Sequence, residues 1–313
     1  MLTPESVNKA KVICIMGPTA SGKTALAIEA SKALNAEVVS VDSALIYKDM
    51  DIGTAKPDAK EQDGVPHHLI DIVSPEISYS VADFIKDAQL AIDDILKRNK
   101  LPILTGGTMM YFNALIKGLN ELPPSAPEVR AQIQSEIEEF GLPAMHERLA
   151  HIDPQSAARI HANDLQRTTR ALEVYRASGK TLTQWQQAEK SQLPYDFVQC
   201  TIMPKERADL HTNIALRFDQ MLENGLVEEV RYLCEKYNLH PDMPSLRSVG
   251  YRQVWQYLQG ELDYNNMRER GIIATRQLAK RQLTWLRGWP DVLALESGDN
   301  SNINKLVQKL GAT

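Results

Sequence analysis

The first third of the chain alternates short apolar runs with amphipathic segments. Residues 11–16 (KVICIM) form a continuous apolar, β-branched run, which is typical of a strand buried on both faces of a sheet. Residues 81–98 carry apolar side chains at helical spacing along one face. Similar patterns predict strands at residues 37–41, 68–73 and 101–105, and helices at residues 23–34 and 108–116. This alternation predicts an α/β fold, with a mostly parallel sheet that helices cover on both faces.

The pattern changes after residue 121. Residues 122–127 (LPPSAP) interrupt it with prolines, and residues 128–190 show only short helical patterns without a strand. Residues 197–203 are β-like again, and long helical patterns follow from about residue 207, one of them at 264–287. The sequence therefore predicts a core interrupted by an all-helical insertion. The expected parts are a first core segment (1–121), the insertion (122–195) and a continued core with C-terminal helices (196–313).

Length and composition limit the class of protein. The 313 residues exceed one domain of common size, and 43% apolar with 24% charged residues exclude wholesale disorder. No run reaches the roughly 18 to 20 apolar residues that span a bilayer, and the N-terminus lacks the pattern of a secretion signal. Three scattered cysteines support neither a disulfide framework nor a structural zinc site. We expect a cytoplasmic protein.

Positive charge is concentrated in two stretches, although the net charge is −5. Residues 159–180 carry a charge of +3 and residues 268–287 carry +5, so the remaining chain carries −13. Two basic stretches on an acidic body fit a localised contact with a polyanion. Two solvated helix faces would give the same pattern, and charge alone does not decide between these interpretations.

A glycine-rich motif follows the first predicted strand directly and opens the first predicted helix. Its residues match G-x-x-x-x-G-K-[ST] and are Gly17, Pro18, Thr19, Ala20, Ser21, Gly22, Lys23 and Thr24. In this context the backbone N–H groups and the helix N-terminus surround phosphate oxygens, while Lys23 adds a cation and the Thr24 hydroxyl can bind Mg²⁺. The motif is typical of ATP-binding and other nucleotide-binding proteins. It predicts a diphosphate or triphosphate ligand, but not whether phosphorus or carbon is attacked.

One carboxylate is well placed to face that ligand. The strand at residues 101–104 ends in TGGT, without the acid that often holds Mg²⁺ in kinases with this loop. Asp42, by contrast, directly follows the strand at residues 37–41. Ligands of open α/β sheets bind beyond the carboxyl ends of the strands. Asp42 is therefore a candidate base, and a carboxylate that only caps loop N–H groups is the alternative.

The ordered set of motifs resembles the tRNA dimethylallyltransferases, also called tRNA isopentenyltransferases. The matching segments lie between about residues 12 and 288 and are GPTASGKT (17–24), DSALIY (42–47), MDIGTAKP (50–57), GGTMMY (106–111), DLQRTTR (164–170), SGKTL (178–182), LRSVGYR (246–252) and TRQLAKRQLTW (275–285). The loop alone is common, whereas the joint set is specific. Asp49 stands where the family pattern leads us to expect glycine, and the tail after Pro290 matches nothing.

The resemblance implies transfer of a dimethylallyl group from its diphosphate to N6 of adenosine 37, beside the tRNA anticodon. It implies a P-loop-type core with a helical insertion and dependence on Mg²⁺, which Thr24 would bind. Asp42, Lys23 and Thr24 would be the catalytic residues, and Arg217 would join the loop in binding the diphosphate. A surface arginine on an amphipathic helix is the other interpretation of Arg217.

The resemblance also implies a set of tRNA contacts, which includes much of both basic stretches. The residues are Asp42, Ser43, Ala44, Leu45, Thr108, Arg130, Gln166, Arg167, Thr168, Thr169, Arg170, Arg247, Ser248, Val249, Gly250, Tyr251, Arg252, Lys280, Arg281, Gln282, Leu283, Thr284, Trp285, Leu286 and Arg287. Aromatic residues at helical spacing are usually core residues, so we assign no base stacking to them. His67 and His68 are interpreted as structural rather than metal-binding. We expect a monomer.

Three other functions remain open from the sequence. A small-molecule kinase would use the same loop for ATP but has no need for basic helices. A prenyltransferase acting on free adenine nucleotide would need no large RNA-contacting insertion. A P-loop protein that binds RNA without catalysis would not need an acid at Asp42.

Overall fold

A computed structural model describes residues 9–120, 122–188 and 190–311 of the chain. The chain divides into two compact units, which are Met1–Ile116 with Pro194–Thr313, here called the sheet unit, and Lys117–Leu193, here called the helical unit. The expected boundary at residue 121 lies outside the described residues. None of the described helices combines the length and the apolar character needed to cross a bilayer.

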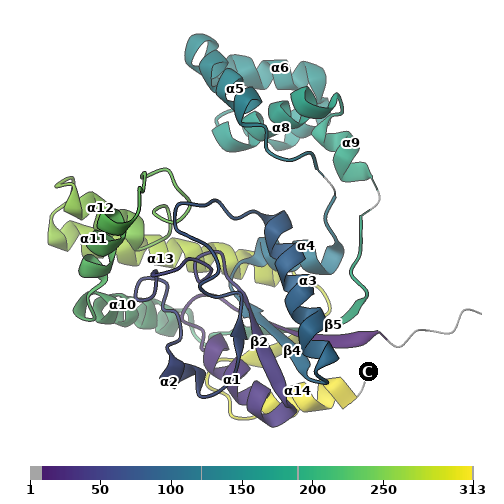
Figure 1. The fold of residues 1–313 in the computed structure, drawn as a ribbon, viewed down its shortest axis with the longest axis vertical. Helices are drawn as coiled ribbons and strands as arrows, with labels where there is room; N and C mark the ends of the chain where they lie inside the picture. Colours follow the sequence, from purple (N-terminus) through teal and green to yellow (C-terminus); the bar gives the residue numbers. More distant parts are fainter. Residues whose placement is uncertain (1–8, 121, 189, 312–313) are drawn as a thin grey trace, which may run out of the picture. The chain divides into compact units, whose positions relative to one another are not determined.

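The sheet unit is built on a parallel sheet (Figure 1). In the described residues its six strands lie in the order β3-β2-β4-β1-β5-β6, and every pairing is parallel. The strands are β1 (Ala10–Met16), β2 (Ala36–Val41), β3 (His67–His68), β4 (Leu101–Gly106), β5 (Tyr195–Met203) and β6 (Leu293–Glu296). The predicted α/β class is confirmed, and the carboxyl ends of β1, β2 and β4 lie side by side at one edge.

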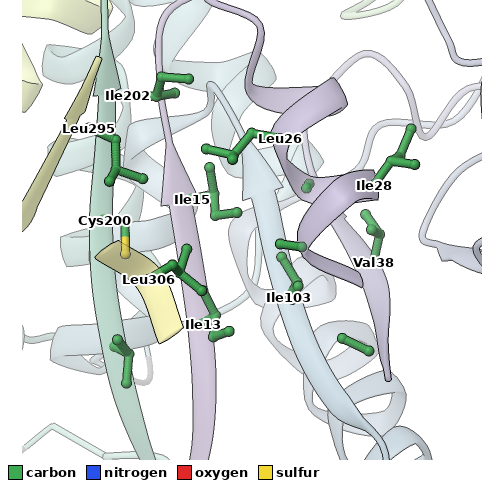
Figure 2. Packing of buried hydrophobic residues seen from close by; sticks show 14 of the residues in the cluster. Ile13, Ile15, Leu26, Ile28, Val38, Ile103, Cys200, Ile202, Leu295 and Leu306 are labelled. Carbon is green, nitrogen blue, oxygen red and sulfur yellow. The ribbon is translucent and has the colours of Figure 1, made fainter. Parts of the chain in front are cut away.

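Helices cover both faces of this sheet. On one face α1 (Lys23–Leu34) and α14 (Asn302–Gly311) pack over a core that includes Ile15 and Ile103, as Figure 2 shows. Residues that alternate with these along the strands, such as Cys14 and Leu104, are also completely buried. The helix α3 (Val81–Lys97) contacts β4 and β2 and buries a separate apolar stripe. Burial on both faces explains the uninterrupted apolar runs of the strands.

The structure corrects the prediction at residues 68–73. Only His67 and His68 pair with β2, and the chain then leaves the sheet. Leu69 and Asp71 have φ angles of 61° and 56°, which lie in the left-handed region and cannot continue a strand. Apolar alternation in the sequence does not report such backbone turns.

The tail after Pro290 contributes two elements that the sequence did not reveal. The strand β6 pairs with β5, and α14 brings Leu306 into the core beside α1. The strand has four residues, of which only Leu295 is buried. Such a short segment carries too little alternation to predict a strand.

A second core lies among the C-terminal helices of the sheet unit. The helices are α10 (Arg207–Glu223), α11 (Leu226–Lys236), α12 (Tyr251–Leu258) and α13 (Tyr264–Arg287). Their apolar faces enclose Ile46, Tyr47 and Met50 from the segment that follows β2. The helices therefore fix this segment at the carboxyl edge of the sheet. The short helices α2 (Ala59–Gln62) and α4 (Met109–Lys117) complete the unit.

The helical unit contains only helices and irregular segments apart from one isolated bridge, between Leu119 and Ser191, among its described residues. Its helices are α5 (Pro127–Phe140), α6 (Leu142–Ile152), α7 (Pro154–Arg159), α8 (Leu165–Ser178) and α9 (Leu182–Gln187). Ile133, Met145 and Leu149 are completely buried in their shared core. The unit thus has an apolar core of its own.

One buried carboxylate ties β2 to its neighbours and makes stability depend on pH. Glu37 is 1% exposed, and it accepts hydrogen bonds from Arg98 and from Lys100 Nζ at 2.8 Å, while its Oε2 lies 2.7 Å from His68 Nε2. The Arg98 guanidinium, together with Lys100 and His68, holds the pKa of Glu37 well below its usual range. The ionised form is therefore favoured in the folded state.

We expect Glu37→Gln to lower the free energy of unfolding at pH 7 by about 1 to 3 kcal/mol, because the cations lose their charged acceptor. The folded pKa lies below the unfolded value of about 4.3, so this stability is present above about pH 4.3 and is lost as pH falls toward the folded pKa. Urea unfolding of both proteins at pH 7 and in acid measures it. A difference in unfolding free energy between the two proteins that is the same at every pH would contradict this role of Glu37.

Candidate active site

The phosphate loop forms a cradle between β1 and α1. Ala20 and Gly22 have φ angles of 62° and 80°, so the backbone turns twice through the left-handed region before α1 begins at Lys23. This curl directs successive N–H groups toward one point at a helix N-terminus. Lys23 Nζ donates to the carbonyl of Pro18 at 3.2 Å, so the side chain folds back over the loop. The tail adds a support, since Ser297 Oγ donates to the carbonyl of Ser21 at 2.9 Å.

A pocket lies against this loop at the carboxyl edge of the sheet. It brings together residues that the sequence singled out from separate segments, and its lining includes Thr19, Ala20, Lys23, Thr24, Asp42, Ala44, Leu45, Arg217, Ser248, Val249, Tyr251 and Gln282. The loop, the acid after β2 and a helix from the C-terminal part therefore share one site. Gly17, Pro18, Ser21 and Gly22 are the other residues of the loop.

Asp42 is held in a fixed orientation at the pocket. Its Oδ1 accepts a hydrogen bond from the backbone N–H of Ala44 at 2.9 Å. Among the described residues no hydrogen-bond donor reaches Oδ2, which leaves that oxygen for a ligand. The neighbouring Ser43 N–H donates to Thr108 Oγ1 at 3.1 Å, linking this turn to the end of β4. The capping role and a role as a base are thus compatible, because they use different oxygens.

Two cations share the pocket with Asp42. Burial lowers the pKa of Lys23 to about 8, with the charge of Asp42 opposing this shift and Arg217 adding to it. Burial also lowers the pKa of Arg217 from its usual value, against the influence of Asp42 and Glu61. Burial removes water from the charged groups of Lys23 and Arg217, which is unfavourable. An anionic ligand bound beside them would stabilise both positive charges. Arg217 is therefore part of the pocket and not a solvated surface arginine.

The loop fits a magnesium–diphosphate complex. Thr24 lines the pocket beside Lys23, and Ser21 Oγ is buried without a hydrogen-bond partner among the described residues. Mg²⁺ prefers oxygen ligands and usually keeps several waters, so one hydroxyl and the ligand phosphates suffice. Within the described ranges no cluster of three or more His, Cys, Asp or Glu side chains forms a separate metal site. His67 Nδ1 instead bonds the Val65 carbonyl at 2.8 Å.

A clamped loop forms another wall of the pocket. Glu229 of α11 accepts hydrogen bonds from the N–H groups of Asp51, Ile52 and Gly53 at 3.0, 2.7 and 3.1 Å. The Tyr251 hydroxyl donates to the same carboxylate at 2.5 Å. One carboxylate thus holds the first part of the MDIGTAKP motif (50–57), and Gly53 and Thr54 of this motif line the pocket.

Sequence reasoning missed the apolar part of the pocket. Ile214, Phe218, Met221 and Leu278 line it, together with the hydroxyl-bearing side chain of Thr275. Three of these apolar residues lie at helical spacing on α10, which predicts only a buried face. A pattern that is common to every amphipathic helix does not identify a ligand pocket.

The expected RNA-contact stretches of the sheet unit separate into exposed and buried members. Arg247, Arg252, Lys280, Arg281, Thr284, Trp285 and Arg287 are exposed, whereas Gly250, Tyr251, Gln282, Leu283 and Leu286 are buried. The buried side chains pack within the unit, while Tyr251 and Gln282 also line the pocket, so the contact of this group with RNA stays a prediction. The exposed group keeps that prediction.

The helical unit contains the remaining expected contacts. Arg130 and Arg170 both bond the buried carboxylate of Glu173, at 3.2 and 3.0 Å. Gln166 and Arg167 are exposed on α8. Thr168 and Thr169 are buried, and their contact with RNA stays a prediction. Of the expected contacts in this unit, Arg130, Gln166 and Arg167 are thus exposed.

The unusual residue Asp49 has a local explanation. Its φ angle of 62° is one that glycine adopts at little cost, which accounts for the glycine expected there. Asp49 accepts hydrogen bonds from Lys236 Nζ at 2.7 Å and from the Tyr237 hydroxyl. These contacts stabilise the aspartate, and Asp49 is not among the residues that line the pocket.

The chain is similar to one family model and to several solved structures. A family model described as IPP transferase matches residues 45–289. The solved tRNA isopentenylpyrophosphate transferase of Bacillus halodurans is 37% identical, with a TM-score of 0.72 and coverage of 97% of this chain and 98% of that chain. The tRNA delta(2)-isopentenylpyrophosphate transferase of Staphylococcus epidermidis is 35% identical, with a TM-score of 0.67 and the same coverage. A eukaryotic dimethylallyltransferase acting on tRNA is 29% identical, with a TM-score of 0.80 and coverage of 96% and 77%.

Proposed function

The chain belongs to the IPP transferase family, and on this premise we propose that it prenylates tRNA. The dimethylallyl group of dimethylallyl diphosphate would pass to N6 of adenosine 37, beside the anticodon, and pyrophosphate would be released. The observation that carries the proposal is the pocket in which the phosphate loop, Asp42, Arg217 and an apolar wall come together. It offers separate places for a pyrophosphate, an isoprenoid and an acid–base group.

The cations and the loop would bind the leaving group. As the bond between the allylic carbon and the pyrophosphate oxygen breaks, negative charge develops on the pyrophosphate. Loop N–H groups, Lys23 and Arg217 would stabilise that charge with little reorganisation. Mg²⁺, held by Thr24, would supply further neutralisation of the same charge. The apolar residues of α10 would surround the five-carbon chain and exclude water from the allylic cation.

Asp42 would act on the nucleophile. The exocyclic amine of adenine is a weak nucleophile because its lone pair is delocalised into the ring. Asp42 Oδ2 can accept a hydrogen bond from the N–H₂ group and take one proton as the new carbon–nitrogen bond forms. The bond from Ala44 N–H to Oδ1 orients the carboxylate for this transfer. The products are then the N6-alkylated adenosine and intact pyrophosphate.

Access of the adenine to this pocket would require a base extruded from the anticodon loop. The exposed arginines and lysines of α13 and of the helical unit are suited to the RNA backbone around it. These features favour tRNA over a free adenine nucleotide, which would need no such contacts. Family membership argues against a small-molecule kinase and against a binding protein without catalysis. We propose that the protein acts in the cytoplasm as a monomer.

The acceptor can be tested by competition. The protein is incubated with Mg²⁺, dimethylallyl diphosphate and an equimolar mixture of unmodified tRNA and adenosine monophosphate, without ATP. Nucleoside mass spectrometry of each acceptor should find prenylated adenosine in tRNA only. Prenylation confined to the free nucleotide would replace the proposed acceptor, and the absence of product in both would reject the prenyltransferase.

We expect tRNA affinity to fall steeply as the salt concentration rises. Each phosphate contact made by an exposed arginine or lysine releases condensed counterions, so the logarithm of affinity falls linearly with the logarithm of salt. Filter binding across a salt series measures this slope. Arg281→Ala should lower the magnitude of this slope by about 1, because one phosphate contact is lost. A slope near zero in the unsubstituted protein would exclude the basic stretches from RNA binding.

A further inference from the structure

The buried residue Gln282 makes two hydrogen bonds that join a C-terminal helix to the phosphate loop. It is 7% exposed on α13, between the exposed Arg281 and the buried Leu283. Its Oε1 accepts from the backbone N–H of Thr19 at 2.9 Å, and its Nε2 donates to the carbonyl of Gly107 at 2.9 Å. Because a backbone N–H only donates and a carbonyl only accepts, these partners fix the orientation of the amide.

The two partners of Gln282 lie in segments that follow different strands. Thr19 belongs to the loop that follows β1, and Gly107 follows the end of β4. A side chain at residue 107 would displace the amide, since a Cβ built there lies 2.3 Å from Gln282 Nε2. The Thr19 N–H donates to Gln282 and is therefore not available to a ligand. The later N–H groups of the loop remain for the ligand.

We propose that Gln282 is a positioning residue of the phosphate loop. This inference rests on the proposed function, because it assigns a role within the same pyrophosphate site. The helix α13 then contributes one face to RNA binding and the opposite face to the pyrophosphate site. Exposed residues such as Arg281 face outward toward a polyanion, while Gln282, one residue further, holds the first turn of the loop in the shape that binds pyrophosphate.

Adjacent substitutions on α13 should therefore have opposite effects. The full chain is titrated with magnesium pyrophosphate in a calorimeter, and separately with tRNA by filter binding. Gln282→Met preserves side-chain length but leaves the Thr19 N–H without its acceptor, so pyrophosphate affinity should fall about tenfold. Its tRNA affinity should remain within about twofold of the unsubstituted protein. Arg281→Ala should show the reverse, with weakened tRNA binding and unchanged pyrophosphate binding.

A second variant disturbs the same contact without altering the helix. Gly107→Ala should push the Gln282 amide away and weaken pyrophosphate binding while sparing tRNA affinity, and thermal unfolding of both variants monitors folding. Equal pyrophosphate affinity in folded Gln282→Met and the unsubstituted protein would overturn the inference, as would a loss confined to tRNA binding. If the unsubstituted protein itself failed to bind pyrophosphate, the proposed function would be rejected instead.

Discussion

Replacing Asp42 by alanine should reduce turnover by about 10²- to 10⁴-fold, the usual contribution of a general base. The carboxylate removes a proton only as the carbon–nitrogen bond forms, so its loss affects the chemical step more than the binding of RNA. Single-turnover prenylation of tRNA measures the chemical step, and filter binding measures affinity. The tRNA affinity should change far less than the rate.

A matched control lies on the same sheet. Asp196 is an exposed carboxylate near the start of β5, at the opposite edge from the pocket. Asp196→Asn should leave turnover unchanged, which separates a specific role of Asp42 from a general effect of removing negative charge. Full activity of Asp42→Ala would remove this residue from the mechanism. A loss of tRNA affinity as large as the loss of rate would assign Asp42 to binding.

Replacing Lys23 by methionine should reduce turnover by about 10²- to 10³-fold, comparable to the removal of one preorganised donor at a developing anion. The loss should appear in single turnover and in the affinity for magnesium pyrophosphate. The substitution Lys97→Met removes an exposed lysine in the last turn of α3 and serves as the control. Normal pyrophosphate release by Lys23→Met would exclude the lysine from charge stabilisation.

The same lysine should produce a dependence on pH. Its pKa of about 8 means that the ammonium loses its proton as pH rises through that value, and the neutral amine no longer attracts pyrophosphate. We therefore expect kcat/KM for dimethylallyl diphosphate to fall above about pH 8, since this ratio reports groups of the free enzyme. Lys23→Arg keeps its charge throughout this range, so the fall should move to higher pH. If kcat/KM of Lys23→Arg fell at the same pH as in the unsubstituted protein, the fall would belong to another group.

Much of the fold follows from local patterns that the sequence displays. The buried strand at β1 and the long helix α13 were predictable because apolar periodicity records which faces become buried. The strand expected at residues 68–73 was wrong because Leu69 and Asp71 adopt left-handed backbone angles, which side-chain hydrophobicity does not encode. The tail was missed because β6 gains its order from β5 and not from its own four residues.

The candidate site was predictable where a motif carries its own chemistry. The phosphate loop and Asp42 could be located from glycine spacing and from the end of a strand. Gln282 could not be separated from its neighbours by resemblance alone, since it lies within a basic stretch. Its spacing from Ala279 and Leu286 nevertheless places it on the buried face of α13. Glu229 carried no signal, because its partners are backbone groups brought near only by folding.

The proposed ligand of the loop is a pyrophosphate that leaves from an isoprenoid carbon. The direct measurement incubates the protein with Mg²⁺, dimethylallyl diphosphate, ATP and unmodified tRNA, and follows all phosphate species by phosphorus NMR beside nucleoside mass spectrometry. We expect one intact pyrophosphate for each prenylated adenosine, with ATP unconsumed. Cleavage of ATP with transfer of its terminal phosphoryl group to an acceptor, and no prenylated adenosine, would contradict it.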